Sequence, residues 1–151
     1  MNSLDISFVK RTVIDNIVIG HIDNSTIHGL GLFATRMVKE GEILCILDGQ
    51  VVPKSQYETI RNSLIEHVSH PYDQYFFMEW NVLDNDTLLV RPFRTKYSYI
   101  NHSRKPNLKI AKFPLRIVAL TEIMQNEELT LDYREEPLST EYMEGHGKTY
   151  L

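Results

Sequence analysis

Short runs of strand-forming residues, each ended by turn residues, are the feature that most limits how this chain can fold. The runs cover residues 13–22, 29–34, 42–47, 50–52, 74–80, 87–90, 115–120 and 128–133. Their uneven spacing argues against a plain sandwich, and a single helical stretch interrupts them. The pattern therefore predicts a mainly β domain of the α+β class.

Two glycine-containing segments between these runs have the composition of tight turns. They are Lys39-Glu40-Gly41-Glu42 and Leu47-Asp48-Gly49-Gln50. Glycine adopts positive φ without a steric penalty, and short turns of this kind connect antiparallel strands. We expect a hairpin at each of them, and a third turn at residues 84–86 between two later strands.

The region around residues 53–71 follows a different period. Apolar side chains recur there at three- and four-residue spacing, at Tyr57, Ile60, Leu64, Ile65 and Val68. Pro53 and Ser55 stand where a helix would begin, and Pro71 stands where it would stop. The spacing predicts one amphipathic helix over residues 53–70.

Length and cysteine content limit the class of protein. A chain of 151 residues with 42% hydrophobic residues can bury one continuous core without a metal or disulfide framework. Cys45 is the only cysteine, which favours a reducing, intracellular compartment, cytoplasmic or, in a eukaryote, nuclear. It lies in an apolar run and is expected to be a buried hydrophobe. His67 and His70 have no third ligand nearby in sequence, so we expect no metal site.

Charge and hydropathy exclude further classes. The net charge is −4 and no dense cluster of Lys and Arg occurs, which argues against a nucleic-acid groove and favours basic partners. No apolar stretch is long enough to span a bilayer. Residues 122–144 concentrate the acidity against Arg134 alone: Glu122, Glu127, Glu128, Asp132, Glu135, Glu136, Glu141 and Glu144. This segment is either a solvated acidic face or a surface that steers a cationic substrate.

Three separated segments carry residues suited to chemistry. They read Gly29-Leu30-Gly31-Leu32-Phe33-Ala34, Ile100-Asn101-His102-Ser103-Arg104-Lys105-Pro106-Asn107 and Glu127-Glu128-Leu129-Thr130-Leu131-Asp132-Tyr133. In this order, and with Gly41-Glu42 after the first, they resemble the SET-domain family over residues 13–133. The resemblance implies a β-clip-like fold of several short sheets, with one inserted helix and a threaded C-terminal segment.

The same resemblance implies domain limits. We expect the SET domain over residues 1–136, and a tail over residues 137–151 that closes the site. Tyr142 or Tyr150 would then lie over the cofactor as a lid.

The family resemblance also implies a function. It indicates an S-adenosylmethionine-dependent enzyme that methylates lysine side chains of a basic, histone-like protein or peptide. The implied cofactor-binding residues are His28, Gly29, Leu30, Gly31, Tyr75, Asn101, His102 and Tyr133. Tyr133 is also the implied catalytic residue. The alternative is a catalytically inactive SET-like module that binds a partner protein; the oligomeric state is open.

Side-chain chemistry also supports these site residues, independently of the family resemblance. Gly29 and Gly31 lack a Cβ and let the main chain approach a ligand closely. Asn101 and His102 offer donors and acceptors suited to an amino-acid carboxylate or an adenine edge. A tyrosine of pKa near 10 stays protonated at neutral pH, so Tyr133 is expected to orient the acceptor amine and polarise the methyl donor rather than act as a strong base.

The chemistry of the acceptor lysine limits what the active site can look like. A lysine of pKa about 10.4 must lose its proton before it can attack a methyl group. A narrow apolar channel would lower that pKa, whereas carboxylates in the channel would oppose proton loss, so we expect them outside it. Leu47 and Ile110 stand near the positions of channel tyrosines in many members of the family and lack hydroxyls. The degree of methylation is therefore open.

Overall fold

The computed structural model describes residues 15–71, 79–91, 94–136, 143–149 and 151. Its strands are β1 (Gly20–Asn24), β2 (Leu30–Ala34), β3 (Ile43–Ile46), β4 (Gln50–Pro53), β5 (Glu79–Val82), β6 (Thr87–Arg91), β7 (Asn101–His102), β8 (Leu108–Ala111), β9 (Arg116–Ala119) and β10 (Thr130–Leu131). Helix α2 (Lys54–Ile65) and the short 3-10 helices η3 (Lys96–Tyr99), η4 (Tyr133–Glu135) and η5 (His146–Thr149) connect or follow them. The expected mainly β fold is confirmed.

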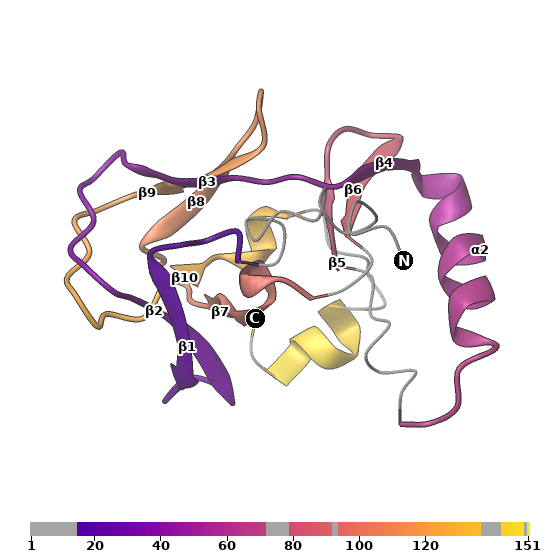
Figure 1. Cartoon of the computed structure of the whole chain (residues 1–151), viewed down its shortest axis with the longest axis horizontal. Helices are drawn as coiled ribbons and strands as arrows, with labels where there is room; N and C mark the ends of the chain where they lie inside the picture. Colours follow the sequence, from indigo (N-terminus) through magenta and orange to yellow (C-terminus); the bar gives the residue numbers. More distant parts are fainter. Residues whose placement is uncertain (1–14, 72–78, 92–93, 137–142, 150) are drawn as a thin grey trace, which may run out of the picture.

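The strands form four small sheets. Strands β1 and β2 pair antiparallel, β9 lies between β3 and β8, and β6 lies between β4 and β5. Strands β7 and β10 pair in parallel near the centre of the molecule, and α2 lies at the end remote from the β1–β2 hairpin (Figure 1). The central pair joins the second and third sequence motifs.

The two predicted hairpins at Gly41 and Gly49 are wrong. Strand β3 pairs with β9, and β4 pairs with β6, so neither turn joins paired strands. Gly41 has φ of +79°, and its N–H donates to the carbonyl of Ala119. At Gly49, a Cβ would lie 2.8 Å from the carbonyl oxygen of Val90. Both glycines therefore serve contacts with distant strands, which the local turn pattern does not reveal.

The predicted helix is present but shorter than expected. It ends at Ile65, and Tyr57 is its buried residue. The Tyr57 ring packs edge-on against Trp80 at 6.1 Å between centroids, whereas Ile60 and Leu64 are exposed. The predicted turn at residues 84–86 is confirmed, because Asp84 Oδ1 accepts the N–H groups of Asp86 and Thr87. Strands β7 and β8 were not predicted.

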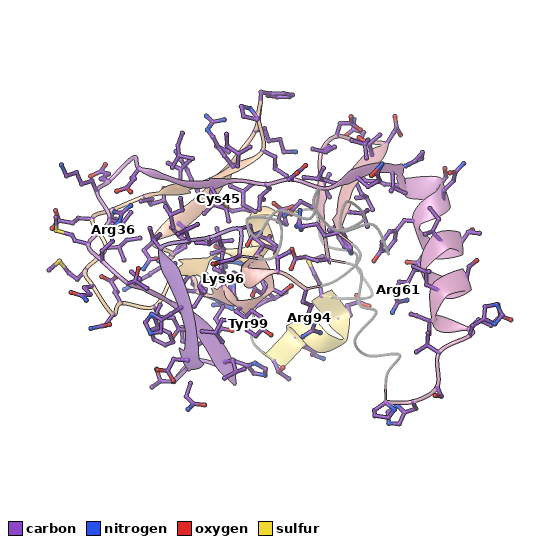
Figure 2. The ribbon with its side chains drawn as sticks, in the orientation of Figure 1. Arg36, Cys45, Arg61, Arg94, Lys96 and Tyr99 are labelled. Carbon is purple, nitrogen blue, oxygen red and sulfur yellow. The ribbon has the colours of Figure 1, made fainter. Side chains whose placement is uncertain are left out.

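The main core lies between the β1–β2 hairpin, the central pair and the β3–β9–β8 sheet. Its fully buried members include Ile17, Leu32, Val38, Ile100, Leu108, Ile117, Ile123 and Leu129. Cys45 packs at the edge of this core, where burial raises the pKa of its thiol to about 11 (Figure 2). A thiol with so high a pKa is not an activated nucleophile.

A buried polar network ties strands β5 and β6 to the chain entering η3. Arg91 donates to the carboxylate of Glu79 and to the amide oxygen of Asn81. The backbone N–H of Thr95 donates to Glu79 Oε2 at 2.9 Å. Asn81 Nδ2 in turn donates to the hydroxyl of Tyr97 at 2.9 Å. The network therefore fixes η3, which leads directly into Asn101 and His102.

Asn107 holds the second motif against the third. Its Oδ1 accepts the N–H of Thr130 at 2.9 Å, and its Nδ2 donates to the carbonyl of Glu128 at 2.8 Å. The side chain is 9% exposed. Asn107 thus satisfies backbone groups beside β10 that have no neighbouring strand on that side, which gives the motif asparagine a structural reason.

Candidate functional site

The first motif forms a tight turn that meets Asn101. Ser25 N–H donates to the carbonyl of Gly29 at 2.8 Å, and Gly29 has φ of +49°. Asn101 Nδ2 lies 3.2 Å from the carbonyl oxygens of both His28 and Leu30. The structure therefore places the predicted residues of the first two motifs in direct contact.

The Glu128 carboxylate joins these segments and was not predicted as a site residue. Ser25 Oγ donates to its two oxygens at 2.7 and 2.9 Å, and Asn101 Nδ2 donates to Oε1 at 2.8 Å. A Cβ on Gly31 would lie only 2.3 Å from Oε1. Gly31 therefore makes room for Glu128, which differs from the expectation that its missing Cβ faces a ligand.

The two glycines of the turn should respond differently to substitution. We expect Gly31→Ala to lower the free energy of unfolding by about 1–3 kcal/mol, because Glu128 must leave its hydrogen bonds. Gly29→Asn should stay close to the parent, since a Cβ on Gly29 would meet no atom within 4 Å and asparagine tolerates positive φ. Urea denaturation measures both.

A double variant identifies the clash. Adding Glu128→Ala to Gly31→Ala should cost less than the sum of the two single changes, because the colliding carboxylate is gone. Strict additivity would show that Gly31 is required for another reason.

His102 and Tyr133 form the second part of the site. The Tyr133 N–H donates to His102 Nδ1 at 3.1 Å, and the rings lie 5.4 Å apart between centroids. Burial is the main cause that lowers the pKa of His102, so the ring is neutral at pH 7 with its proton on Nε2. Nε2 is buried and has no hydrogen-bond partner in the part of the chain that the structure describes. The Tyr133 hydroxyl donates to the carbonyl of Ile100.

Asp132 is neutralised by its neighbour. Arg134 Nε donates to Asp132 Oδ1 at 2.8 Å, and this side-chain hydrogen bond is the largest cause that lowers the pKa of Asp132 to about 2. Its Oδ1 lies 3.7 Å from His102 Nδ1. Because that nitrogen accepts the Tyr133 N–H, the contact is not an ion pair.

A pocket opens beside Tyr133. Its empty volume is about 450 Å³, the space open to solvent included. Its lining residues are Tyr97, Ile110, Lys112, Leu131, Asp132, Tyr133, Glu135 and Glu136. Carboxylates thus line the pocket that contains Tyr133, contrary to the expectation that they stay outside it. Ile110 lines it as expected, whereas Leu47 is buried in the core.

Some of the remaining predicted residues lie outside the described part of the chain, and others make contacts that the structure shows. Tyr75, Tyr142 and Tyr150 lie outside the described residues, so the lid stays a prediction. Near the end of the chain, Arg104 of the second motif donates to the carbonyl of Leu151. In the acidic segment, Glu127 and Glu128 accept hydrogen bonds from Asn107 and Asn101, and Asp132 pairs with Arg134, while Glu127 and Glu135 are exposed to solvent.

The polar atoms left over in this site fit an S-adenosyl group. Asn101 Oδ1 receives no hydrogen bond from a described residue, and the nearby carbonyl of Leu30, which lies 3.2 Å from Asn101 Nδ2, has a second lone pair. These acceptors suit an ammonium. The buried N–H at His102 Nε2 suits an acceptor such as a carboxylate or an adenine nitrogen. Both kinds of group occur on that cofactor.

Metal-binding groups and membrane-spanning helices are both absent from the part of the chain that the structure describes. The described residues contain no group of three His, Cys, Asp or Glu side chains close enough to hold a metal ion. Within the same ranges, no helix has the length and apolar character required to cross a membrane.

Comparison with known proteins places this arrangement in a family. The SET-domain family model matches residues 29–134. The chain is 31% identical over 114 residues to a variant-silencing SET domain-containing protein of Plasmodium falciparum, covering 70% of this chain and 4% of that protein. It is 32% identical over 122 residues to the histone-lysine N-methyltransferase trithorax of Drosophila virilis, covering 73% of this chain and 3% of that protein. The chain spans only a small part of these relatives, and the match to the family model shows that it belongs to the SET-domain family.

Proposed function

We propose that this chain is an S-adenosylmethionine-dependent methyltransferase that acts on lysine side chains of a protein substrate. The observation that carries the proposal is the position of Tyr133. Its ring packs against His102, whose buried Nε2 has no hydrogen-bond partner among the described residues, and Tyr133 also lines the pocket. One residue thus touches both a candidate cofactor surface and a candidate acceptor pocket.

The family supports this class of reaction. SET domains are typically lysine methyltransferases, and the trithorax relative carries that activity in its name. The cofactor supplies an electrophilic methyl group when it is bound. The substrate contributes a lysine whose neutral amine accepts it, and a basic protein agrees with the acidic residues around the pocket.

Each residue of the site has a role in this proposal. The carbonyl of Leu30, with Asn101 Oδ1, binds the cofactor's ammonium beside the backbone of His28, and His102 Nε2–H donates to one of the cofactor's acceptors. Gly29 gives the turn its shape. Tyr133, held by its hydroxyl to the carbonyl of Ile100, orients the acceptor amine and excludes water from one side of it.

Cofactor binding can be tested apart from transfer. Isothermal titration with S-adenosylmethionine should show binding to the parent, and Asn101→Leu should weaken it by about tenfold or more, because charged-group hydrogen bonds are lost. Asn85→Leu, in the exposed turn between β5 and β6, is the control and should bind like the parent. Circular dichroism confirms that both variants fold.

Transfer requires a second experiment. The parent is incubated with isotopically labelled cofactor and a histone mixture, and modified residues are identified by mass spectrometry. Label on lysine supports the proposal. Cofactor binding with label only on another residue type would reject lysine as acceptor, and no cofactor binding would favour the inactive binding module.

A further inference from the structure

The pocket beside Tyr133 combines apolar walls with several carboxylates. Ile110 and Leu131 supply aliphatic surface, and the rings of Tyr97 and Tyr133 supply aromatic surface. Such walls suit the methylene chain of a long side chain. The carboxylates give the pocket a charge preference, and they differ in how much of their charge is already compensated.

Asp132 and Glu135 are poor candidates for binding an incoming cation. Asp132 is occupied by Arg134, whose guanidinium donates to both of its oxygens. Glu135 is exposed to solvent, where water weakens an ion pair. Glu136 is the remaining carboxylate of the pocket.

Glu136 is partly buried and only partly compensated. Burial is the largest cause that raises the pKa of its carboxyl, and Glu135 raises it further. Lys112 and a backbone hydrogen bond from Val82 act in the opposite direction. A desolvated carboxylate in this state gains more from a cation than an exposed one does.

Two other pocket residues define the surroundings of Glu136. Its negative charge contributes to raising the pKa of the Tyr97 hydroxyl, so the two groups lie close together. Lys112 is exposed, and its Nζ lies 3.3 Å from the carbonyl of Leu83. The pocket therefore has a fixed neutral hydroxyl beside Glu136 and a cation only at its outer side.

We propose that this pocket receives the alkyl chain of the acceptor lysine and that Glu136 is the specificity-determining residue that binds its ammonium group. The inference rests on the proposed function. It goes further because it assigns the binding of the lysine ammonium, before methyl transfer, to Glu136. This residue lies outside the three sequence motifs and is not among the proposed cofactor-binding residues.

The assignment separates binding from transfer. A carboxylate that binds the ammonium stabilises its protonated form and so opposes the proton loss that methyl transfer requires. Glu136→Gln should therefore raise KM for a lysine peptide by about tenfold, the loss expected for a hydrogen bond to a charged group, without lowering kcat. Glu122→Gln removes the same charge from an exposed position of the same acidic segment and should change neither.

Binding can also be measured without transfer. The probes are Nα-acetyl-lysine amide and its uncharged analogue Nα-acetyl-norleucine amide, titrated into the full chain with S-adenosylhomocysteine present, while the methyl signals of Ile110 are followed by NMR. The lysine probe should bind more tightly than the norleucine probe. Glu136→Gln should weaken the lysine probe by about tenfold and leave the norleucine probe unchanged.

The pH dependence has a defined sign. The lysine ammonium stays charged below its pKa of about 10.4. Binding should therefore be present above the pKa of Glu136 and weaken as the pH falls through it, at higher pH than for an ordinary glutamate of pKa about 4.3. The other titratable residues that line this pocket are Tyr97, Lys112, Asp132, Tyr133 and Glu135, and Arg134 is paired with Asp132. Glu136→Gln should remove this pH step, whereas Lys112→Gln should move it upward, because a cation that lowers the pKa of Glu136 is gone.

The outcomes distinguish this inference from the proposed function. Equal binding of the lysine probe to the parent and to Glu136→Gln would overturn the assignment, as would a lower kcat with unchanged KM. If the parent methylates lysine while either result is found, the proposed function stands and only Glu136 is wrongly assigned. If the parent methylates no lysine but Glu136 determines probe binding, the pocket recognises a cation and the proposed reaction fails.

Discussion

Arg91→Met is expected to lower the free energy of unfolding by about 3–5 kcal/mol, because it removes one partner of a buried ion pair. We expect no larger stability change from the other substitutions considered. The side chains of Arg91 and Glu79 are 4% and 2% exposed. Methionine fills similar space but leaves the Glu79 charge buried without its cation. Urea denaturation at neutral pH, followed by circular dichroism, measures the change.

A matched surface pair provides the control. Arg36 pairs with Glu42 in the same way, but the Arg36 side chain is 52% exposed, so Arg36→Met should leave the denaturation midpoint close to that of the parent. Adding Glu79→Gln to Arg91→Met should recover part of the loss, because the unpaired charge is removed while an acceptor for Thr95 N–H remains. An Arg91→Met variant as stable as Arg36→Met would contradict the role of the buried network.

Tyr133→Phe is expected to reduce methyl transfer by about a hundredfold or more, while cofactor affinity changes by less than about threefold. The hydroxyl anchors the ring to the carbonyl of Ile100. In the proposed mechanism the unanchored ring would no longer hold the acceptor amine in line. Single-turnover transfer to a lysine peptide and isothermal titration measure the two quantities.

The control removes a hydroxyl from the same region. Tyr99 lies in η3 near the centre of the molecule, and its hydroxyl forms no hydrogen bond with a described residue (Figure 2). Tyr99→Phe should transfer at the parental rate. Full activity of Tyr133→Phe would remove Tyr133 from the mechanism, whereas loss of both activity and cofactor binding would indicate a structural role.

Local sequence patterns predicted local structure well. Helix α2 and the β5–β6 turn depend on neighbouring residues, so spacing and turn composition were sufficient. The partner of β3 is β9, which lies far along the chain from it, and no local signal specifies that pairing. The glycine turns were misread for the same reason: Gly41 and Gly49 contact distant strands.

The residues of the candidate site also fall into those that the sequence could identify and those that it could not. Asn101, His102 and the Gly29 turn carry distinctive residue types and could be selected from sequence. Glu128 and Glu136 could not, because they stand in an acidic stretch whose average property is exposure to solvent. Glu128 contacts Ser25, and Glu136 interacts with Lys112 and Val82, and only the folded chain brings these partners together.

The Glu128 carboxylate has a thermodynamic consequence for the whole chain. Its partners Ser25 and Asn101 come from segments separated from it by 103 and 27 positions, so the turn they shape exists only once those segments have assembled. No fragment holding the glycine turn alone can present the same surface. The cofactor binding proposed at that turn would therefore be linked to folding, and saturating S-adenosylmethionine should raise the melting temperature as the logarithm of its concentration increases.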